Sequence, residues 1–322
     1  MQGKRVLVSG AGGFIGRWSV PALLRRGYDV HAVLSGNAAR DVPEQLSGAR
    51  THNADLFDDS AVAELLRAVR PTHLLHFAWI ATPGLYWHSP ENYRWLSASE
   101  RLLRAFRAHG GHRALMAGSC AEYDWSRAAV CDEKASPLAD ASTASLSAYA
   151  ECKIRLQRAL AEFGREDEFS TAWGRIFFQF GPHEHPERLV ASVICNLLLS
   201  REAPCSEGSQ IRSFLHVADV GAAFAAVLDS ELEGPVNIGS DERITVADLV
   251  RRIGRQIGRS EFLRIGARPA SPQEPALLVP ELRRLREEVR WQPAFTLDEG
   301  LRDAIAWWRS RLFDSAGVSR TE

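Results

Sequence analysis

The chain has 322 residues, of which 45% are apolar and 25% are charged, and its formal net charge at pH 7 is -1. This composition excludes disordered and fibrous proteins and allows one large domain or two modest ones. Because no block of like charge exceeds a few residues, nothing indicates binding to nucleic acid or to an anionic membrane. The expected partners are small molecules.

The sequence also bears on location and redox state. Residues 1–5 run directly into an apolar strand and no apolar run approaches membrane-spanning length, so we expect a cytoplasmic protein without a signal peptide. The five cysteines form neither a C-x-x-C pair nor a metal-ligand cluster with the ten histidines. We therefore expect free thiols and no metal site.

The first motif is a glycine-rich turn between a strand and a helix. The apolar run Val6–Val8 leads into Gly10-Ala11-Gly12-Gly13-Phe14-Ile15-Gly16, and helical periodicity continues to Arg26. Glycines adopt positive φ and have no Cβ, so the backbone can approach a pyrophosphate at the positive helix end. A turn that only caps the helix is the alternative, because the spacing is G-x-x-G-x-x-G. The predicted dinucleotide contacts are Gly10, Gly13, Phe14, Ile15, Gly16 and Arg17.

The second strand, Asp29–Leu34, ends without the carboxylate that accepts hydrogen bonds from the adenosine ribose of NAD. A carboxylate there would repel a 2′-phosphate, whereas Ser35 and Arg40 are suited to bind one, and Arg17 is a further candidate. A solvated loop arginine is the alternative for Arg40. The favoured cofactor is therefore NADP(H), with NAD(H) as the second choice.

Three elements follow: a strand over 49–53, a helix over 58–69 and a strand over 71–78. We expect Asp55, with Leu56 beside it, to accept the adenine amino group after the first of these strands. Ala78 is small enough at the end of the other strand to let the backbone lie against the cofactor.

The next stretch, 79–95, is loop-like and rich in aromatic side chains, Tyr86 among them. Such rings either stack on a base or sugar or fill an interface, and the sequence leaves both open. A helix over 91–109 and a strand over 113–117 complete this part of the chain.

Three polar side chains then form a candidate catalytic group. Ser119 follows the strand over 113–117, and Tyr149 and Lys153 are four apart on a helix over 147–163, so they share one face. An adjacent ammonium is expected to lower the phenol pKa from about 10. Tyr149 can then exchange a proton with a carbonyl or alcohol oxygen that Ser119 also contacts, while Lys153 holds the nicotinamide ribose. An exposed Tyr/Lys pair is the alternative.

Together with the glycine turn, these residues resemble the extended short-chain dehydrogenase/reductase family, the NAD(P)-dependent epimerases and dehydratases of nucleotide sugars. The resemblance extends from Arg5 to about Trp308. Phe178 and Phe180 depart from the family pattern, which has Asn and Tyr there, and the Asn often found in the family's long helix has no clear counterpart near Trp95. Four further segments are similar to family motifs: Arg175–Pro182, Gly208–Asp219, Val236–Gly239 and Trp291–Pro293.

The resemblance implies an α/β fold, in which a Rossmann-type doubly wound parallel sheet carries a smaller C-terminal α/β substrate lobe. The implied dinucleotide-binding domain is 1–175, and the chain returns to it at about 213–240. The implied lobe consists of 176–212 and 241–312. Residues 313–322 are expected to form a frayed tail. The resemblance also implies a homodimer that packs the helices at about 91–109 and 147–163 into a four-helix bundle. The apolar face for this, equally suited to packing within the chain, is Ile154, Leu156, Leu160 and Phe163.

Substrate contacts are implied by the same resemblance. Arg212 matches the family arginine that binds the pyrophosphate of the sugar nucleotide, for which a guanidinium is geometrically suited. Further candidates for substrate contact are Tyr86, Glu122, His183 and Arg268. An exposed, proline-flanked loop is the alternative for His183.

These features favour an NADPH-dependent reductase of a nucleotide-linked 4-keto-6-deoxy sugar, with Tyr149 as general acid toward the keto oxygen. An epimerase recycles one retained NAD, so the missing carboxylate favours net reduction. The first alternative is an NAD-dependent nucleotide-sugar 4-epimerase. A dehydratase is disfavoured because Cys120-Ala121 stand where an acidic pair is usual. The second alternative, a non-catalytic NADP(H)-binding regulatory protein, is disfavoured by the intact Ser119, Tyr149 and Lys153.

The cofactor hypothesis makes a direct prediction. We expect the purified protein to bind NADPH in preference to NADH, and Arg40→Ala to abolish the preference, because the guanidinium is assigned to the 2′-phosphate. Titration followed by reduced-cofactor fluorescence measures both affinities. A preference for NADH, or NAD already bound after purification, would contradict the assignment.

Overall fold

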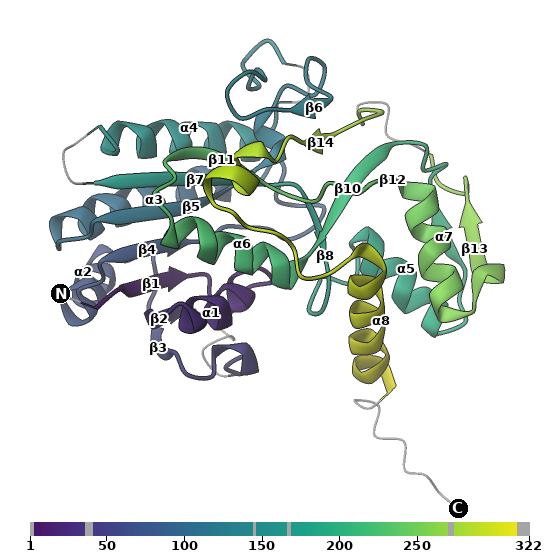
Figure 1. Cartoon of the computed structure of the whole chain (residues 1–322), viewed down its shortest axis with the longest axis horizontal. Coiled ribbons are helices and arrows are strands. Elements are labelled where there is room, and N and C mark those ends of the chain that lie inside the picture. Colours follow the sequence, from purple (N-terminus) through teal and green to yellow (C-terminus); the bar gives the residue numbers. More distant parts are fainter. Residues whose placement is uncertain (1–2, 36–40, 144–145, 166–168, 270–273, 314–322) are drawn as a thin grey trace, which may run out of the picture.

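The computed structural model describes residues 3–35, 41–143, 146–165, 169–269 and 274–313. Its centre is a seven-stranded sheet in the order β11-β7-β5-β4-β1-β2-β3, and every pair in it is parallel (Figure 1). The strands are β1 (Arg5–Ser9), β2 (Asp29–Leu34), β3 (Arg50–Asn53), β4 (His73–His76), β5 (Arg113–Ser119), β7 (Ser170–Ile176) and β11 (Gly234–Ile238).

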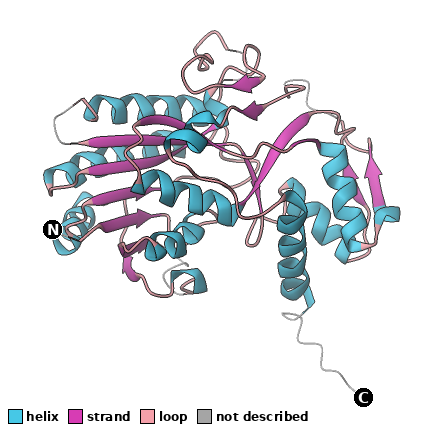
Figure 2. Cartoon of the chain, viewed as in Figure 1, coloured by secondary structure: helices cyan, strands magenta, loops and turns pink. Residues whose placement is uncertain are grey.

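Helices cover both faces of this sheet (Figure 2). One buried cluster joins α1 (Gly16–Arg25) and α6 (Val217–Asp229) to the sheet. A second joins α2 (Asp59–Val69), α3 (Glu91–Ala108) and α4 (Ala148–Phe163). Because both faces are covered, most strands are buried along nearly their whole length and not at alternate residues. The expected Rossmann-type doubly wound sheet is confirmed.

The strand order reverses between β1 and β4, which are neighbours in the sheet. The connection after β1 leads to β2, and the chain reaches β4 only after β3 and α2. In open α/β sheets a crevice forms at the carboxyl ends of two such strands. The glycine turn after β1 and residues 77–78 after β4 therefore meet there.

The turn is tight because backbone packs on backbone. Gly10 has φ of +66°, and a Cβ there would lie 2.7 Å from the Ala78 backbone nitrogen. A Cβ on Gly16 would collide with the Gly10 carbonyl oxygen, and one on Gly13 would lie 3.1 Å from the same atom. Gly10 is thus required by conformation and by close approach, Gly16 is required by close approach alone, and Gly13 leaves little room for a side chain.

A smaller lobe lies beside the main sheet, to its right in Figure 1. Its three-stranded sheet has the order β12-β10-β8, and its helices enclose a separate buried cluster. The strands are β8 (Phe178–Phe180), β10 (Ile211–His216) and β12 (Arg243–Thr245), with β9 (Ala203–Cys205) and β13 (Leu263–Ile265) as a further pair; the helices are α5 (Leu189–Leu198), α7 (Val246–Ile257) and α8 (Leu297–Phe313).

The motif Arg175–Pro182 is divided between β7 of the main sheet and β8 of the lobe, close to the expected division after residue 175. A later segment differs from the sequence expectation. Within the stretch expected in the lobe, β14 (Val279–Pro280) pairs with β6 (Val130–Cys131), and Leu282, Leu285 and Trp291 pack in the cluster around α6. The remaining domain divisions stay predictions.

The helix face assigned to a dimer is used within the chain. Ile154, Leu156 and Leu160 are at most 4% exposed, and Leu156 and Leu160 belong to the cluster beneath α4. Phe163 packs against the same cluster. These side chains are therefore not available to a partner, and the homodimer stays a prediction without them.

Two smaller expectations concern the cysteines and the membrane. All five cysteines are free thiols, as expected. Within the described ranges, no helix is long and apolar enough to cross a bilayer.

The glycine turn gives a stability prediction. Gly16→Ala places a Cβ against the Gly10 carbonyl, so we expect the free energy of unfolding to fall by about 1–3 kcal/mol, as for other overpacked sites. Gly3→Ala is the matched control, because no atom lies within 4 Å of the added carbon. Denaturant unfolding measures both variants, and equal stabilities would show that the turn relaxes freely.

Candidate active site

A cavity of about 920 Å³ lies where the glycine turn, the end of β5, the start of α4 and the lobe meet. Its volume is in the range of small-molecule sites, about 300–1,000 Å³. Eight of the residues predicted to contact the cofactor line it: Gly10, Gly13, Phe14, Ile15, Gly16, Ala78, Tyr149 and Lys153.

The turn suits the pyrophosphate of a dinucleotide. The helix α1 begins at the cavity, where no side chain of the described residues caps its first N–H groups and the first turn holds no acidic residue. These groups and the helix dipole favour an anion. A Cβ on Gly10 or Gly16 would close the approach. The residues present therefore fit a dinucleotide cofactor.

Other predicted cofactor contacts lie outside the cavity lining. The Arg17 guanidinium donates hydrogen bonds to the carbonyls of Gly12 and Gly13, at 2.6 and 3.0 Å. Ser35 is exposed just after β2, and Arg40 lies outside the described residues.

The predicted adenine contacts are divided between surface and core. The exposed Asp55 accepts a hydrogen bond from the Phe57 backbone N–H at 2.9 Å. Leu56 is 8% exposed and belongs to the cluster beneath α2 and α3. The adenine contact of this pair stays a prediction.

The structure brings Ser119, Tyr149 and Lys153 together on one wall of the cavity. Ser119 ends β5, and its side chain opposes the rise in the pKa of Tyr149. The Lys153 ammonium donates to the Ala117 carbonyl at 2.9 Å and lies 3.8 Å from the centre of the Trp79 ring. The start of α4 is held in place because the Ser147 hydroxyl accepts from Ala150 N–H.

The protonation of these groups differs from the expectation. Burial and the neighbouring Tyr86 raise the pKa of Tyr149, against the opposing effect of the Ser119 side chain. Burial lowers the pKa of Lys153 to about 7, and its Nζ is directed to Ala117 and Trp79. The predicted lowering of the Tyr149 pKa by Lys153 is therefore wrong for this structure. A phenol with a raised pKa stays protonated at neutral pH and is a weaker acid than a free phenol.

Glu122 does not contact the cavity, so its prediction as a substrate contact is wrong. It is fully buried and accepts hydrogen bonds from Ser119 N–H at 2.7 Å, Trp173 Nε1 at 3.0 Å and Arg175 Nε at 2.8 Å. The Ser119 hydroxyl in turn accepts from Ala121 N–H, so the two side chains form a capping box. Glu122 thus fixes the backbone that carries Ser119.

The other predicted substrate contacts differ in placement. Tyr86, His183 and Arg212 line the cavity, whereas Arg268 is exposed and does not. Arg212 is 1% exposed on β10, and its guanidinium donates to Glu274 Oε1 at 3.0 Å. Burial lowers the pKa of His183 to about 4, so this ring is neutral.

The aromatic loop over 79–90 is held by a residue that the sequence did not single out. Asn92 is fully buried; its amide donates to the carbonyls of Tyr86 and Ser89, at 2.6 and 2.9 Å, and accepts from Trp79 Nε1 at 2.8 Å. The rings of Tyr86 and Tyr149 meet edge to face at 4.9 Å. Trp79 thus packs on Lys153, and Tyr86 packs on Tyr149. For these two rings, packing within the chain answers part of the question whether the aromatic side chains of 79–95 stack on a ligand or fill an interface.

Two lobe residues at the cavity also had no signal in the sequence. Glu184 is 4% exposed, and Arg188 lies beside Tyr86, 5.9 Å from the centre of its ring. A carboxylate and a guanidinium in a proline-flanked loop are common on surfaces, and only the fold places these two at a cavity.

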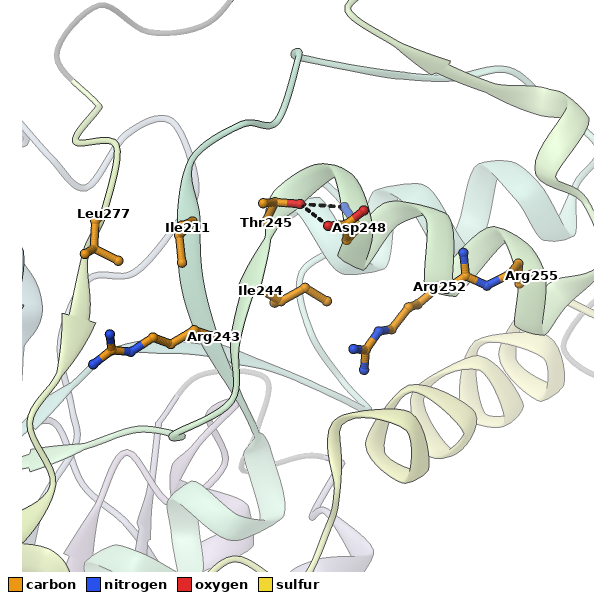
Figure 3. A pocket seen from close by; sticks show the side chains of 8 residues that line it. All are labelled: Ile211, Arg243, Ile244, Thr245, Asp248, Arg252, Arg255 and Leu277. Atoms are coloured by element: carbon orange, nitrogen blue, oxygen red, sulfur yellow. Dashed lines mark hydrogen bonds between the residues drawn. The ribbon is translucent and has the colours of Figure 1, made fainter.

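A second hollow, of about 470 Å³, lies on the lobe around β12 and the start of α7 (Figure 3). Figure 3 shows three arginines there, Arg243, Arg252 and Arg255, and the hydrogen bonds between Thr245 and Asp248. It shares no residue with the first cavity and contains none of the predicted catalytic residues.

The carboxylates of Asp132, Glu133 and Glu281 gather within 4.8 Å of one another. Each accepts a hydrogen bond from a backbone N–H, those of Ala135, Asn237 and Arg283 respectively. These bonds account for the cluster within the fold, and the absence of a metal site stays a prediction.

Fold and cavity together define an enzyme that uses a nicotinamide dinucleotide, with a serine, a tyrosine and a lysine at the reaction site. Residues 6–239 match the model of the NAD dependent epimerase/dehydratase family. The chain therefore belongs to that family, and the resemblance to the extended short-chain dehydrogenases/reductases is confirmed. The protein is an NAD(P)-dependent enzyme.

Relatives extend over nearly the whole chain. A UDP-glucose 4-epimerase from Erwinia amylovora is 25% identical over 334 residues, which cover 94% of this chain and 97% of that protein. The structure of a UDP-glucose 4-epimerase from Thermotoga maritima with UDP-glucose matches with a TM-score of 0.82 and 21% identity, covering 96% of this chain and 99% of that one. The structure of a UDP-glucose 4-epimerase from Thermus thermophilus in complex with NAD matches with a TM-score of 0.77 and 24% identity. The match covers 95% of this chain and 99% of that one. The two structural matches show the fold.

The depressed pKa of Lys153 predicts how stability depends on pH. Between about 7 in the folded protein and the usual 10.5, the unfolded chain binds one more proton at this group than the folded chain. The free energy of unfolding therefore gains about 1.4 kcal/mol per pH unit from Lys153 across this window.

We expect Lys153→Met to lose that slope and to be more stable than the wild type below about pH 7. Lys134→Met, at an exposed lysine, is the control and should keep the wild-type slope. Unfolding at several pH values measures all three, and an unchanged slope in Lys153→Met would contradict the lowered pKa of the buried lysine.

Proposed function

We propose that the protein is an NADPH-dependent reductase of a nucleotide-linked 4-keto-6-deoxy sugar. The observation that carries the proposal is the end of β2, where Leu34 is followed by the exposed Ser35 and not by a carboxylate. A site without that negative charge accepts a 2′-phosphate, and NADPH, which is consumed and replaced at each turnover, suits net reduction.

Bound NADPH supplies the hydride that reduces the keto carbon to an alcohol carbon. Tyr149 gives its phenolic proton to the keto oxygen as that oxygen gains charge, and Ser119 hydrogen-bonds the same oxygen. Tyr149 is protonated before the reaction, and charge that develops on the keto oxygen in the transition state favours transfer of the proton. Solvent returns the proton to Tyr149 afterwards, so one hydride and one proton are consumed per ketone.

Arg212 is assigned to the substrate pyrophosphate. Its guanidinium is buried at the cavity, its Nε has no hydrogen-bond partner among the described residues, and its carboxylate partner, Glu274, is partly exposed. A pyrophosphate offers more acceptor oxygens than one carboxylate. The nucleotide half of the substrate would then lie against the lobe, with the sugar directed to Tyr149.

The second candidate is a nucleotide-sugar 4-epimerase, supported by the names of the relatives described above. The same three catalytic residues suit it, because an epimerase oxidises and re-reduces one carbon. The two activities differ in the fate of the cofactor: the reductase consumes NADPH stoichiometrically, whereas the epimerase turns over with bound NAD and no net oxidation.

The general-acid role predicts a specific loss. Tyr149→Phe removes only the hydroxyl, so we expect turnover of NADPH with dTDP-4-keto-6-deoxyglucose to fall by about 10²–10⁴-fold, the usual contribution of a general acid. NADPH affinity should stay close to that of the wild type. Cofactor oxidation followed at its absorbance band measures turnover, and unchanged turnover would remove Tyr149 from the mechanism.

A further inference from the structure

The feature that the proposed mechanism leaves unused is a buried carboxyl at the cavity. Glu184 lies in the loop between β8 and α5, lines the cavity and is 4% exposed. Its Oε2 atom is buried and has no hydrogen-bond partner among the residues that the structure describes. Leaving such a group unpaired costs free energy, so its retention calls for a reason outside folding.

The surroundings of Glu184 favour a neutral carboxyl. Burial raises its pKa to about 8, although the Arg188 charge and the N–H groups of Ala191 and Gly181 oppose the shift. A protonated carboxyl both donates and accepts a hydrogen bond, as a sugar hydroxyl does. A purely capping role at the start of α5 would instead favour the ionised form.

Arg188 relates Glu184 to the region of the catalytic tyrosine. The Arg188 charge lowers the pKa of Glu184, and the guanidinium carbon lies 5.9 Å from the centre of the Tyr86 ring. The Tyr86 ring meets Tyr149 edge to face at 4.9 Å. Glu184 and Arg188 therefore belong to the part of the cavity next to the phenol. The glycine turn and Arg212 provide two other regions of its lining for phosphates.

We propose that Glu184 binds a hydroxyl group of the hexose of a nucleotide sugar and so helps to select that sugar. The inference rests on the proposed nucleotide-sugar substrate, but it holds for a reductase and an epimerase alike. A hexose hydroxyl supplies the donor and acceptor that the unpaired oxygen lacks. A phosphate is a poorer occupant, because its ionised oxygens only accept hydrogen bonds and would leave the acceptor of the neutral carboxyl without a partner.

If Glu184 has this role, replacing it by an apolar residue should change the folding stability and the affinity for the sugar in opposite directions. Glu184→Leu replaces a buried, unpaired polar group by an apolar one of similar size, which is neutral or stabilising for folding. The same variant has no group to pair with the sugar hydroxyl. Glu184→Gln keeps a neutral donor and acceptor in the same shape.

The experiment compares a nucleoside diphosphate with its sugar by calorimetry. UDP is paired with UDP-glucose and dTDP with dTDP-glucose, each in wild type, Glu184→Leu and Glu184→Gln. We expect Glu184→Leu to weaken binding of the sugar nucleotide by about ten- to a hundredfold, with affinity for the diphosphate and the melting temperature not lowered. Glu184→Gln should recover most of the loss. Glu187→Leu, at an exposed glutamate of the same loop, should behave as wild type.

The outcomes separate the two proposals. If neither pair binds to the wild type, the nucleotide-sugar function fails, and this inference fails with it. The second outcome is that a pair binds with the same ratio of sugar-nucleotide affinity to diphosphate affinity in Glu184→Leu as in the wild type. That result would overturn the hexose contact alone. A lower melting temperature together with weaker diphosphate binding would assign Glu184 to folding of the lobe and would also overturn it.

Discussion

The close approach of two backbone segments at the β1/β4 switch is the constraint on which the rest of the structure depends. Gly10 packs on Ala78, and Gly16 packs on the Gly10 carbonyl, so the start of α1 can face the cavity. A buried chain of hydrogen bonds also supports this junction. The Ser9 hydroxyl lies 2.6 Å from His76 Nδ1, and the Ser99 hydroxyl lies 2.8 Å from His76 Nε2. Strand β1, strand β4 and helix α3 are thereby held in one arrangement.

A second buried network extends this order to the reaction site. The Glu122 carboxylate joins Ser119 N–H to the Arg175 guanidinium, and Tyr123 connects Arg175 to Asn237 of β11. Removing one partner of such an ion pair leaves an uncompensated charge, which is strongly destabilising. The end of β5 is therefore tied to β7 and β11, the strands next to the lobe, so Ser119 and the substrate side of the cavity are positioned together.

Much of this was predictable from the sequence because it depends on local pattern. The glycine spacing, the strand Asp29–Leu34 and the triad all follow from periodicity and motif, and the structure has the same strand and brings the triad together. The inward direction of Glu122 and the burial of Leu156 depend instead on tertiary packing. The Lys153 contacts with Ala117 and Trp79 also depend on tertiary packing, since no sequence spacing relates these residues.

The central claim is that this fold, with no carboxylate after β2, uses an exchangeable NADPH for net reduction. The most direct measurement is to extract and identify any dinucleotide in the purified protein, then to follow deuterium from the reduced nicotinamide into dTDP-4-keto-6-deoxyglucose. The account predicts protein free of NAD and one deuterium at the former keto carbon for each NADPH oxidised. Tightly held NAD, with sugar interconversion and no label transfer, would contradict it.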